Sequence, residues 1–148
     1  MDQEVHVVCP GCSGVNRVPS ARLGGSPVCG RCRAALFQHH PVAVTAATFD
    51  TQIGRSGVPV IVDFWAPWCG PCRAMAPAFE RAAAELEPMV RLAKVDTEAE
   101  TALAARFGIR SIPTLVAFRD GKEVARQSGA MDFAGLVSWS RSVVKIRA

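Results

Sequence analysis

The hydrophobic and polar positions of the chain change their pattern near Pro41. Residues 1–40 place few aliphatic side chains in any periodic arrangement, whereas the rest follows periods typical of strands and helices. The expected elements are, in order, a strand at 42–44, a helix at 45–55, a strand at 60–65, a helix from 69 or 70 to 86, a strand at 91–96, a helix at 98–107, two strands at 113–118 and 123–127, and a helix at 133–145. This order predicts an α/β fold with helices on both faces of one sheet.

Local signals support these boundaries. Thr45 is a suitable N-cap for the first helix, and the sequence SGVP at 56–59 ends it. Pro77 lies within the second expected helix and predicts a kink there. Asp120-Gly121 lies between two apolar runs, which is a strong hairpin signal. The pattern from residue 42 onward is therefore consistent with one complete core.

The first forty residues carry four of the six cysteines, together with three prolines and five glycines. We expect such a segment to bury little apolar surface and to need a staple to hold a fold. Cys9-x2-Cys12 and Cys29-x2-Cys32 are sixteen residues apart, which is typical of a four-cysteine zinc site. We therefore predict a zinc-binding segment at 1–40, with one structural zinc and no open catalytic position, followed by a domain at 41–148.

Two other interpretations of these four cysteines remain open, namely two independent redox pairs or a chance spacing. His39 and His40 are possible substitute ligands. Because four cysteines already fill a tetrahedral site, we expect the two histidines to face solvent in a linker.

The third pair, Cys69 and Cys72, lies where an apolar strand gives way to a helix. The partial positive charge of a helix N-terminus lowers the pKa of a thiol, so Cys69 is the expected nucleophile. Cys72 follows one turn later, near enough to form a disulfide but more enclosed. Gly70 permits a tight turn, and Pro71 suits the first helical turn. There are two alternative interpretations of Cys69 and Cys72. They could be a reduced pair packed as small apolar residues, or a third metal half-site.

Composition and charge narrow the possible functions. The formal net charge of +4 comes from 14 Arg and 3 Lys against 13 acidic residues, with no run of like charge. We therefore expect no nucleic-acid binding. No apolar stretch has the length of a signal peptide core or a membrane span, so we expect a cytoplasmic protein without membrane contact. Thiols are kept reduced in that compartment, which favours metal binding or redox catalysis over structural disulfides. We also expect a monomer.

Asp63 interrupts the strand VIVDFW at 60–65, which is otherwise apolar on both faces. A carboxyl group in such a run should be desolvated, which raises its pKa. The alternative is a polar residue on an exposed strand face.

The segment DFWAPWCGPC at 63–72, the later Ile112-Pro113-Thr114 and Lys94 together resemble the thioredoxin family over residues 42–148. The four-cysteine segment is similar to that of the zinc-containing bacterial thioredoxin 2 type. The resemblance implies a thioredoxin fold, with a central mixed sheet flanked by helices. It also implies that Asp63 accepts a proton from Cys72 and that Lys94 is a buried lysine beside that carboxylate; a strand-edge lysine is the alternative.

The resemblance further implies a cis peptide bond between Ile112 and Pro113, with Pro113 facing the dithiol. It places Trp65 against the active site, although both Trp65 and Trp68 are also compatible with ordinary core positions. The residues implied to contact substrate are Trp68, Gly70, Pro71, Ile112, Pro113 and Gly129.

The predicted function is reduction of protein disulfides by the Cys69–Cys72 dithiol, with recycling by an NADPH-dependent thioredoxin reductase, as the resemblance implies. The chain has no flavin or nicotinamide motif, so we assign those cofactors to the partner. A disulfide oxidase or isomerase on the same fold is an alternative. The Gly-Pro dipeptide between the cysteines resembles that of reductases, and the missing export signal opposes an oxidising compartment. A zinc-based redox sensor, with residues 1–40 as its working part, is the other alternative.

Overall fold

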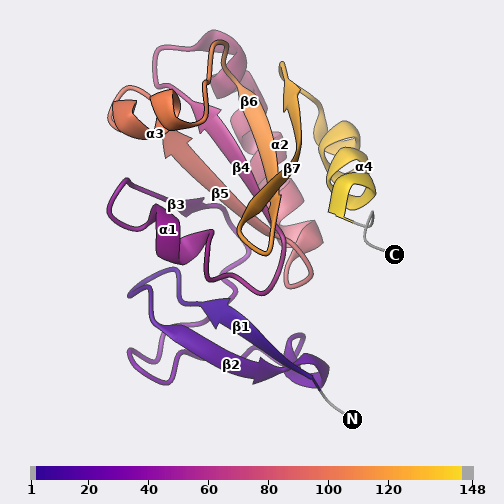
Figure 1. Ribbon diagram of the computed structural model, residues 1–148. Coiled ribbons are helices and arrows are strands. Elements are labelled where there is room, and N and C mark those ends of the chain that lie inside the picture. The colour runs from indigo at the N-terminus through magenta and orange to yellow at the C-terminus, as the bar shows by residue number, and fades with distance from the viewer. Residues whose placement is uncertain (1–2, 145–148) are drawn as a thin grey trace.

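The computed structural model describes residues 3–144, and its main body is a five-stranded sheet of order β3-β5-β4-β6-β7 (Figure 1). The strands are β3 (Val42–Ala43), β4 (Val60–Trp65), β5 (Arg91–Asp96), β6 (Thr114–Arg119) and β7 (Lys122–Ser128). β3 and β4 run parallel to β5, whereas β6 is antiparallel to β4 and to β7. The sheet is therefore mixed, as the resemblance implied.

Helices cover both faces of this sheet, as predicted (Figure 1). One face carries α2 (Gly70–Leu86) and α4 (Phe133–Val144), and the other carries α1 (Phe49–Gln52) and α3 (Thr101–Arg106). Side chains alternate along a strand. Ile61 therefore joins the apolar cluster under α2 and α4, whereas Val60 and Val62 join the cluster under α1 and α3.

Helix α2 begins shortly after β4 ends and positions the cysteine pair. Cys69 is its N-cap, and Pro71 lies in the first turn, where a missing N–H needs no partner. Pro77 lies inside the helix, as predicted. The buried side chains recur every three or four residues and hold the helix on the sheet; they include Cys72, Met75, Phe79, Ala83 and Leu86. The expected helix from 69 or 70 to 86 is confirmed.

Two helices are shorter than the sequence pattern predicts. Within residues 45–55 the regular helix is only α1, because Thr48 Oγ1 accepts a hydrogen bond from Thr45 N–H at 3.0 Å and holds the preceding residues in a turn. α3 begins at Thr101 rather than 98, because the Asp96 carboxylate accepts hydrogen bonds from the backbone N–H groups two and three residues further on. In both places a side-chain oxygen accepts from backbone N–H groups that precede the regular helix, where those donors have no partner within the helix.

The hairpin between β6 and β7 is confirmed. Asp120 and Gly121 have φ values of 53° and 77°, the left-handed conformation that a two-residue hairpin turn requires. The last helix, α4, is present from Phe133 as expected. Its expected end at Lys145 lies outside the described residues.

The first forty residues contain two strands that the pattern did not predict. β1 (Glu4–Val8) and β2 (Val15–Pro19) form an antiparallel hairpin, followed by the short helix η1 (Ser20–Arg22). The expectation of little buried apolar surface is also wrong, since the segment has its own cluster of Val7, Cys9, Val18, Leu23, Cys29, Leu36 and Phe37. Each strand is only five residues long, too short for its alternation to be distinguished from chance.

This N-terminal segment packs against the end of the sheet where β4 and β5 begin (Figure 1). Gly57, just before β4, donates its N–H to the carbonyl of His6 at 2.7 Å. A Cβ on Gly57 would lie 2.8 Å from the His6 nitrogen, so only glycine permits this approach. The Cys69–Cys72 pair follows the opposite end of β4. The two groups of cysteines therefore lie at opposite ends of the sheet.

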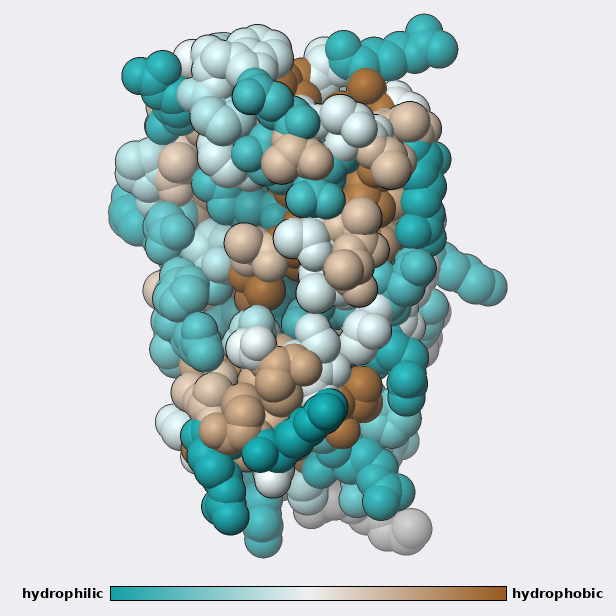
Figure 2. Space-filling view, turned by 90° about the vertical axis from the view of Figure 1, so that its left-hand side faces the viewer, coloured by the Kyte–Doolittle hydropathy of each residue, from teal (hydrophilic) through white to brown (hydrophobic). Residues whose placement is uncertain are grey.

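Figure 2 shows the side of the molecule that carries α1 and α3. Polar residues dominate this side, and apolar surface appears only in small separate groups. Among residues 3–144, the helices are all too short or too polar to cross a bilayer.

Candidate active site and cysteine cluster

Cys69 and Cys72 are joined by a disulfide at the start of α2, with their Cα atoms 5.3 Å apart. Cys69 is 4% exposed and Cys72 is 3% exposed, so the chemistry takes place at a nearly buried pair. The sulfur of Cys69 accepts a hydrogen bond from the backbone N–H of Cys72 at 3.2 Å. When the pair is reduced, this donor and the helix N-terminus favour a thiolate on Cys69.

The peptide bond between Ile112 and Pro113 is cis, as expected from the resemblance. The carbonyl oxygen of Ile112 lies 3.8 Å from Cys69 Sγ, and the Ile112 side chain packs against the buried cluster of Ala66, Cys69 and Cys72. Trp65 packs against the same cluster. The loop before β6 therefore lies directly against the disulfide.

The surface beside the disulfide is open. Trp68 is 67% exposed, the most exposed of the tryptophans in the described chain, and it is not a core residue. Gly129 has φ of 98° and donates its N–H to the Pro113 carbonyl at 2.9 Å. No atom lies within 4 Å of the position a Cβ would take at Gly129 or at Gly70, so a partner can approach both backbones.

Asp63 is 1% exposed and lies on the face of β4 that α2 covers, since Ile61 two residues earlier belongs to the cluster under that helix. Burial raises the pKa of the Asp63 carboxyl to about 7, and the nearby positive charge of Lys94 opposes this shift. Its Oδ1 has no hydrogen-bond partner in the structure. The carboxyl is thus a buried group with a raised pKa, as the sequence predicted, and not a residue on an exposed strand face.

Lys94 lies opposite Asp63 in the register of β4 and β5. Its side chain is partly exposed, whereas the resemblance implied a buried lysine. The Nζ atom lies 4.4 Å from the centre of the Trp65 ring, within the range of a cation–π interaction. β5 lies between β3 and β4, so Lys94 is not on a sheet edge.

The other four cysteines form one compact cluster. Their sulfur atoms all lie within 4.8 Å of one another, with 3.5 Å between Cys9 and Cys32 and 3.7 Å between Cys12 and Cys29. Four thiolates at a Zn–S distance of about 2.3 Å place neighbouring sulfurs about 3.8 Å apart, so this donor set fits a tetrahedral zinc ion.

Backbone and side-chain groups around the cluster donate hydrogen bonds to its sulfur atoms. Backbone N–H groups donate to Cys9, Cys12 and Cys29 at 3.3–3.4 Å. The Asn16 side chain also donates to the Cys29 sulfur, at 3.6 Å, and accepts from the Gly30 N–H. His39 and His40 are exposed and do not join the cluster, as predicted.

Each part of the chain matches a known protein family. A family model described as "Thioredoxin" matches residues 40–142, and one described as "Thioredoxin 2, N-terminal", a zinc ribbon, matches residues 8–34. Thioredoxin C-3 of Corynebacterium nephridii is 45% identical over 133 residues, covering 90% of this chain and 91% of that protein.

The chain belongs to the thioredoxin family.

Two further relatives support this assignment. Thioredoxin 1 of Synechococcus elongatus is 48% identical over 89 residues, which cover 60% of this chain and 83% of that protein. The solved structure of a mutant thioredoxin from Halobacterium salinarum superposes with a TM-score of 0.66 at 32% identity, covering 74% of this chain and 96% of that one. The protein is a thioredoxin-type dithiol–disulfide exchange protein with Cys69 and Cys72 as its redox pair, preceded by a zinc-ribbon domain.

Two residues that fix the zinc ribbon to the thioredoxin sheet were missed by the sequence reasoning. Arg91, the first residue of β5, is 4% exposed and donates to the carbonyls of Val8 and Leu36. Gln52 of α1 is also 4% exposed and donates to the Cys9 carbonyl at 2.9 Å and to Ser13 Oγ at 3.1 Å. The only feature of the sequence that could have indicated the role of Arg91 and Gln52 is that each is a polar residue within or beside an apolar run.

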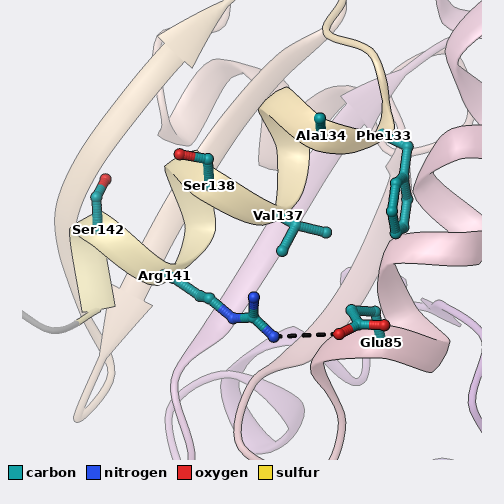
Figure 3. A pocket seen from close by; sticks show the side chains of 7 residues that line it. All are labelled: Glu85, Phe133, Ala134, Val137, Ser138, Arg141 and Ser142. Carbon is teal, nitrogen blue, oxygen red and sulfur yellow. Dashed lines mark hydrogen bonds and ion pairs between the residues drawn. The ribbon is translucent and has the colours of Figure 1, made fainter.

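A groove lies between α2 and α4, lined by residues of neither sulfur site (Figure 3). Its volume is about 620 Å³, and Phe133 and Val137 form its apolar wall. Arg141 extends across it towards Glu85, with 3.3 Å between the charged groups. None of the predicted site residues lines this groove.

Proposed function

We propose that this thioredoxin reduces disulfide bonds in proteins and is itself reduced by an NADPH-dependent thioredoxin reductase. The observation that carries the proposal is the position of Cys69. It is the N-cap of α2, its sulfur accepts the Cys72 N–H, and it lies against the loop of Ile112 and Pro113. A helix N-terminus favours the thiolate, which is the attacking species in disulfide exchange.

The reaction proceeds in two exchange steps. The Cys69 thiolate attacks one sulfur of the substrate disulfide, a Cys69–substrate disulfide forms, and the other substrate sulfur leaves as a thiolate. Cys72 then attacks Cys69 Sγ, which releases the second substrate thiolate and leaves the Cys69–Cys72 disulfide. Two electrons have passed from the dithiol to the substrate. The reductase returns them from NADPH, so flavin and nicotinamide belong to that partner.

Asp63 supplies the base for the second step in this proposal. Cys72 must lose its proton before it attacks, and it lies in the first turn of the helix that covers Asp63. A carboxyl with a pKa of about 7 is half ionised at neutral pH, which suits it to accept that proton. Lys94 maintains this value because its charge favours the carboxylate.

Protein substrates bind across the open surface beside the disulfide. We assign the contacts to the exposed Trp68 ring, the open backbones at Gly70, Pro71 and Gly129, and the loop of Ile112 and Pro113. An extended segment of substrate pairs with the Ile112 backbone and thereby brings its disulfide towards Cys69.

The zinc ribbon holds one structural Zn²⁺ in this proposal, with Cys9, Cys12, Cys29 and Cys32 as its ligands. When bound, the ion neutralises the thiolates and stabilises the fold of the ribbon. We also propose that the protein acts as a monomer in the cytoplasm, where a reducing pool keeps the substrate reaction favourable.

Trapping of substrate tests the assignment of the two thiols. Cys72→Ser should accumulate a substrate disulfide on Cys69 that a reductant releases, whereas Cys69→Ser should trap nothing and lose disulfide reduction. The Cys69→Ser/Cys72→Ser variant is the matched control for adducts on the ribbon cysteines. Adducts recovered on Cys72 rather than Cys69 would reverse the assignment, and the absence of any adduct would refute the proposed reduction of proteins.

A further inference from the structure

Thr114 is the first residue of β6 and directly follows Pro113, yet the sequence reasoning assigned no role to its side chain. It is 2% exposed, and its hydroxyl donates to the carbonyl of Ser111 at 2.6 Å. The same oxygen lies 3.2 Å from Ser128 Oγ. A threonine hydroxyl has a single proton, so Ser128 donates to Thr114 and Thr114 donates to Ser111.

These two hydrogen bonds join the two loops that border the disulfide. Ser111 begins the loop whose Ile112 carbonyl lies 3.8 Å from Cys69 Sγ. Ser128 is the last residue of β7 and precedes Gly129, whose N–H donates to the Pro113 carbonyl. Thr114 and Ser128 also face each other in the β6–β7 ladder, and the buried hydroxyl and the Gly129–Pro113 hydrogen bond continue this connection beyond the ladder to the two loops.

The surroundings of Thr114 indicate that its hydroxyl, rather than its volume, is the feature that matters. The residues that follow it in β6, Leu115 to Phe118, are all buried and apolar. Valine has the same shape as threonine and would suit such a strand, but it cannot donate or accept a hydrogen bond. The hydrogen bonds of the Thr114 side chain go to Ser111 and Ser128, and neither goes to a sulfur atom.

We propose that Thr114 is a positioning residue that fixes loops 111–113 and 128–129 relative to each other and so determines how tightly an extended protein substrate binds. The inference rests on the proposed reduction of protein disulfides. Backbone pairing with a substrate requires donors and acceptors at strand spacing, about 4.8 Å between chains. A loop that drifts by a fraction of this spacing loses the pairing but leaves the Cys69–Cys72 chemistry unchanged.

The test compares Thr114→Val with Thr114→Ser, which keeps the hydroxyl. We measure KM and kcat for reduction of a protein disulfide, the rate with the small aromatic disulfide DTNB, and the reduction potential of the dithiol. Thr114→Val should raise KM about fivefold, the loss expected when hydrogen bonds of this kind are removed. Its kcat, DTNB rate and potential should match wild type, and Thr114→Ser should restore KM.

The matched control is Ser56→Ala. Ser56 is 8% exposed and donates to the Val58 carbonyl at 2.6 Å, a hydrogen bond of the same kind just before β4, at the end of the sheet remote from the disulfide. The Ser56→Ala variant should leave KM for the protein disulfide unchanged. If Thr114→Val does not fold, Ser128→Ala removes the exposed half of the same chain of hydrogen bonds and should raise KM less, in the same direction.

The opposing outcomes are distinct. If Thr114→Val changed the rate with DTNB or the reduction potential of the dithiol as strongly as it changed KM, Thr114 would act on the sulfur chemistry. The inference would then be wrong. Equal KM values for wild type, Thr114→Val and Ser128→Ala would reduce Thr114 to a structural residue. Wild-type protein that leaves protein disulfides intact would refute the proposed function instead.

Discussion

Arg91 donates a hydrogen bond of 2.8 Å from its guanidinium to the carbonyl of Val8, the residue directly before the first cysteine of the cluster. The same guanidinium donates to the carbonyl of Leu36, beyond the fourth cysteine. Glu87, also buried, lies 3.5 Å from Arg91 and accepts a hydrogen bond from the His39 N–H. One ion pair on the thioredoxin domain therefore holds both ends of the zinc ribbon.

Replacing Arg91 by methionine should destabilise the whole chain. The change leaves Glu87 buried without its partner and removes two donors from backbone carbonyls, which typically costs about 3 kcal/mol of the free energy of unfolding. Urea unfolding followed by tryptophan fluorescence measures the loss. Arg141→Met is the control, because its ion pair with Glu85 is exposed and should contribute under about 1 kcal/mol. Equal losses in the two variants would contradict the structural role of Arg91.

Deletion of residues 1–40 should leave a folded domain of lower stability. Both apolar clusters of the sheet lie entirely at residue 42 and beyond, so the core is complete without the ribbon. The deletion exposes the surface around Arg91 and Gln52 to water, however, and the urea midpoint should fall while disulfide reduction persists. Far-ultraviolet circular dichroism and an insulin reduction assay check both points. An unfolded product would show that the two parts form one cooperative unit.

Purified protein should contain one zinc ion per chain, measured by plasma mass spectrometry. Changing Cys9 and Cys12 together to serine removes two of the four ligands and should abolish the metal. The Cys69→Ser/Cys72→Ser variant should keep it, because these cysteines lie at the other end of the sheet. Unchanged zinc in the first variant would exclude the four-thiolate site.

Asp63→Asn should stabilise the protein in a pH-dependent way. The folded carboxyl has a pKa of about 7 against an ordinary value of 3.8, so the unfolded chain loses this proton first as pH rises. The free energy of unfolding of the wild type therefore decreases as the pH rises from the lower to the upper of these pKa values, and it levels off at higher pH. At pH 8 the variant should exceed wild type by at most about 4 kcal/mol, and at pH 3 the two should agree.

Urea midpoints at several pH values measure this difference, with Asp50→Asn, an exposed carboxyl, as the control. The Asp63→Asn variant should also resolve the mixed disulfide between Cys69 and substrate more slowly than wild type below pH 8, where Cys72 needs a base. Single-turnover rates that match wild type at every pH would remove Asp63 from the mechanism.

Lys94→Met should raise the pKa of Asp63 further, since Lys94 is the charge that opposes the effect of burial. The pH profile of the resolving step should move to higher pH by the same amount. Titration of the Asp63 carboxyl carbon by nuclear magnetic resonance measures the shift directly. Lys122→Met, an exposed residue at the start of β7, is the control. A shift to lower pH would mean that Lys94 does not act through its charge.

The chemistry of the thioredoxin site was predictable because it depends on local order in the chain. Cys69 and Cys72 fall at a helix start, and Asp63 interrupts an apolar strand, so the setting of the cysteine pair and the raised pKa of Asp63 follow from their neighbours in the chain. The half-buried state of Lys94 was not predictable, because it depends on the Trp65 ring lying beneath Nζ. The strands of the zinc ribbon were missed because each offers too few apolar positions.

The attachment of the ribbon could not be predicted for a different reason. An arginine at the first position of a strand is typical of a solvated strand end. The carbonyls that make Arg91 a buried residue come from positions 83 and 55 residues away in the chain. No pattern within a single element contains that information, and the same holds for Gln52 and Cys9, which are 43 residues apart.

The placement of six cysteines at the two ends of one sheet has a kinetic consequence. β4 alone, whose six residues span five intervals of about 3.3 Å, separates the Cys69–Cys72 pair from the cluster by roughly 17 Å. Sulfur atoms must touch to exchange, so the dithiol of one molecule cannot reduce the oxidised ribbon of that same molecule. Repair of an oxidised ribbon by this thioredoxin must take place between two molecules. Its rate should therefore rise with the square of the protein concentration.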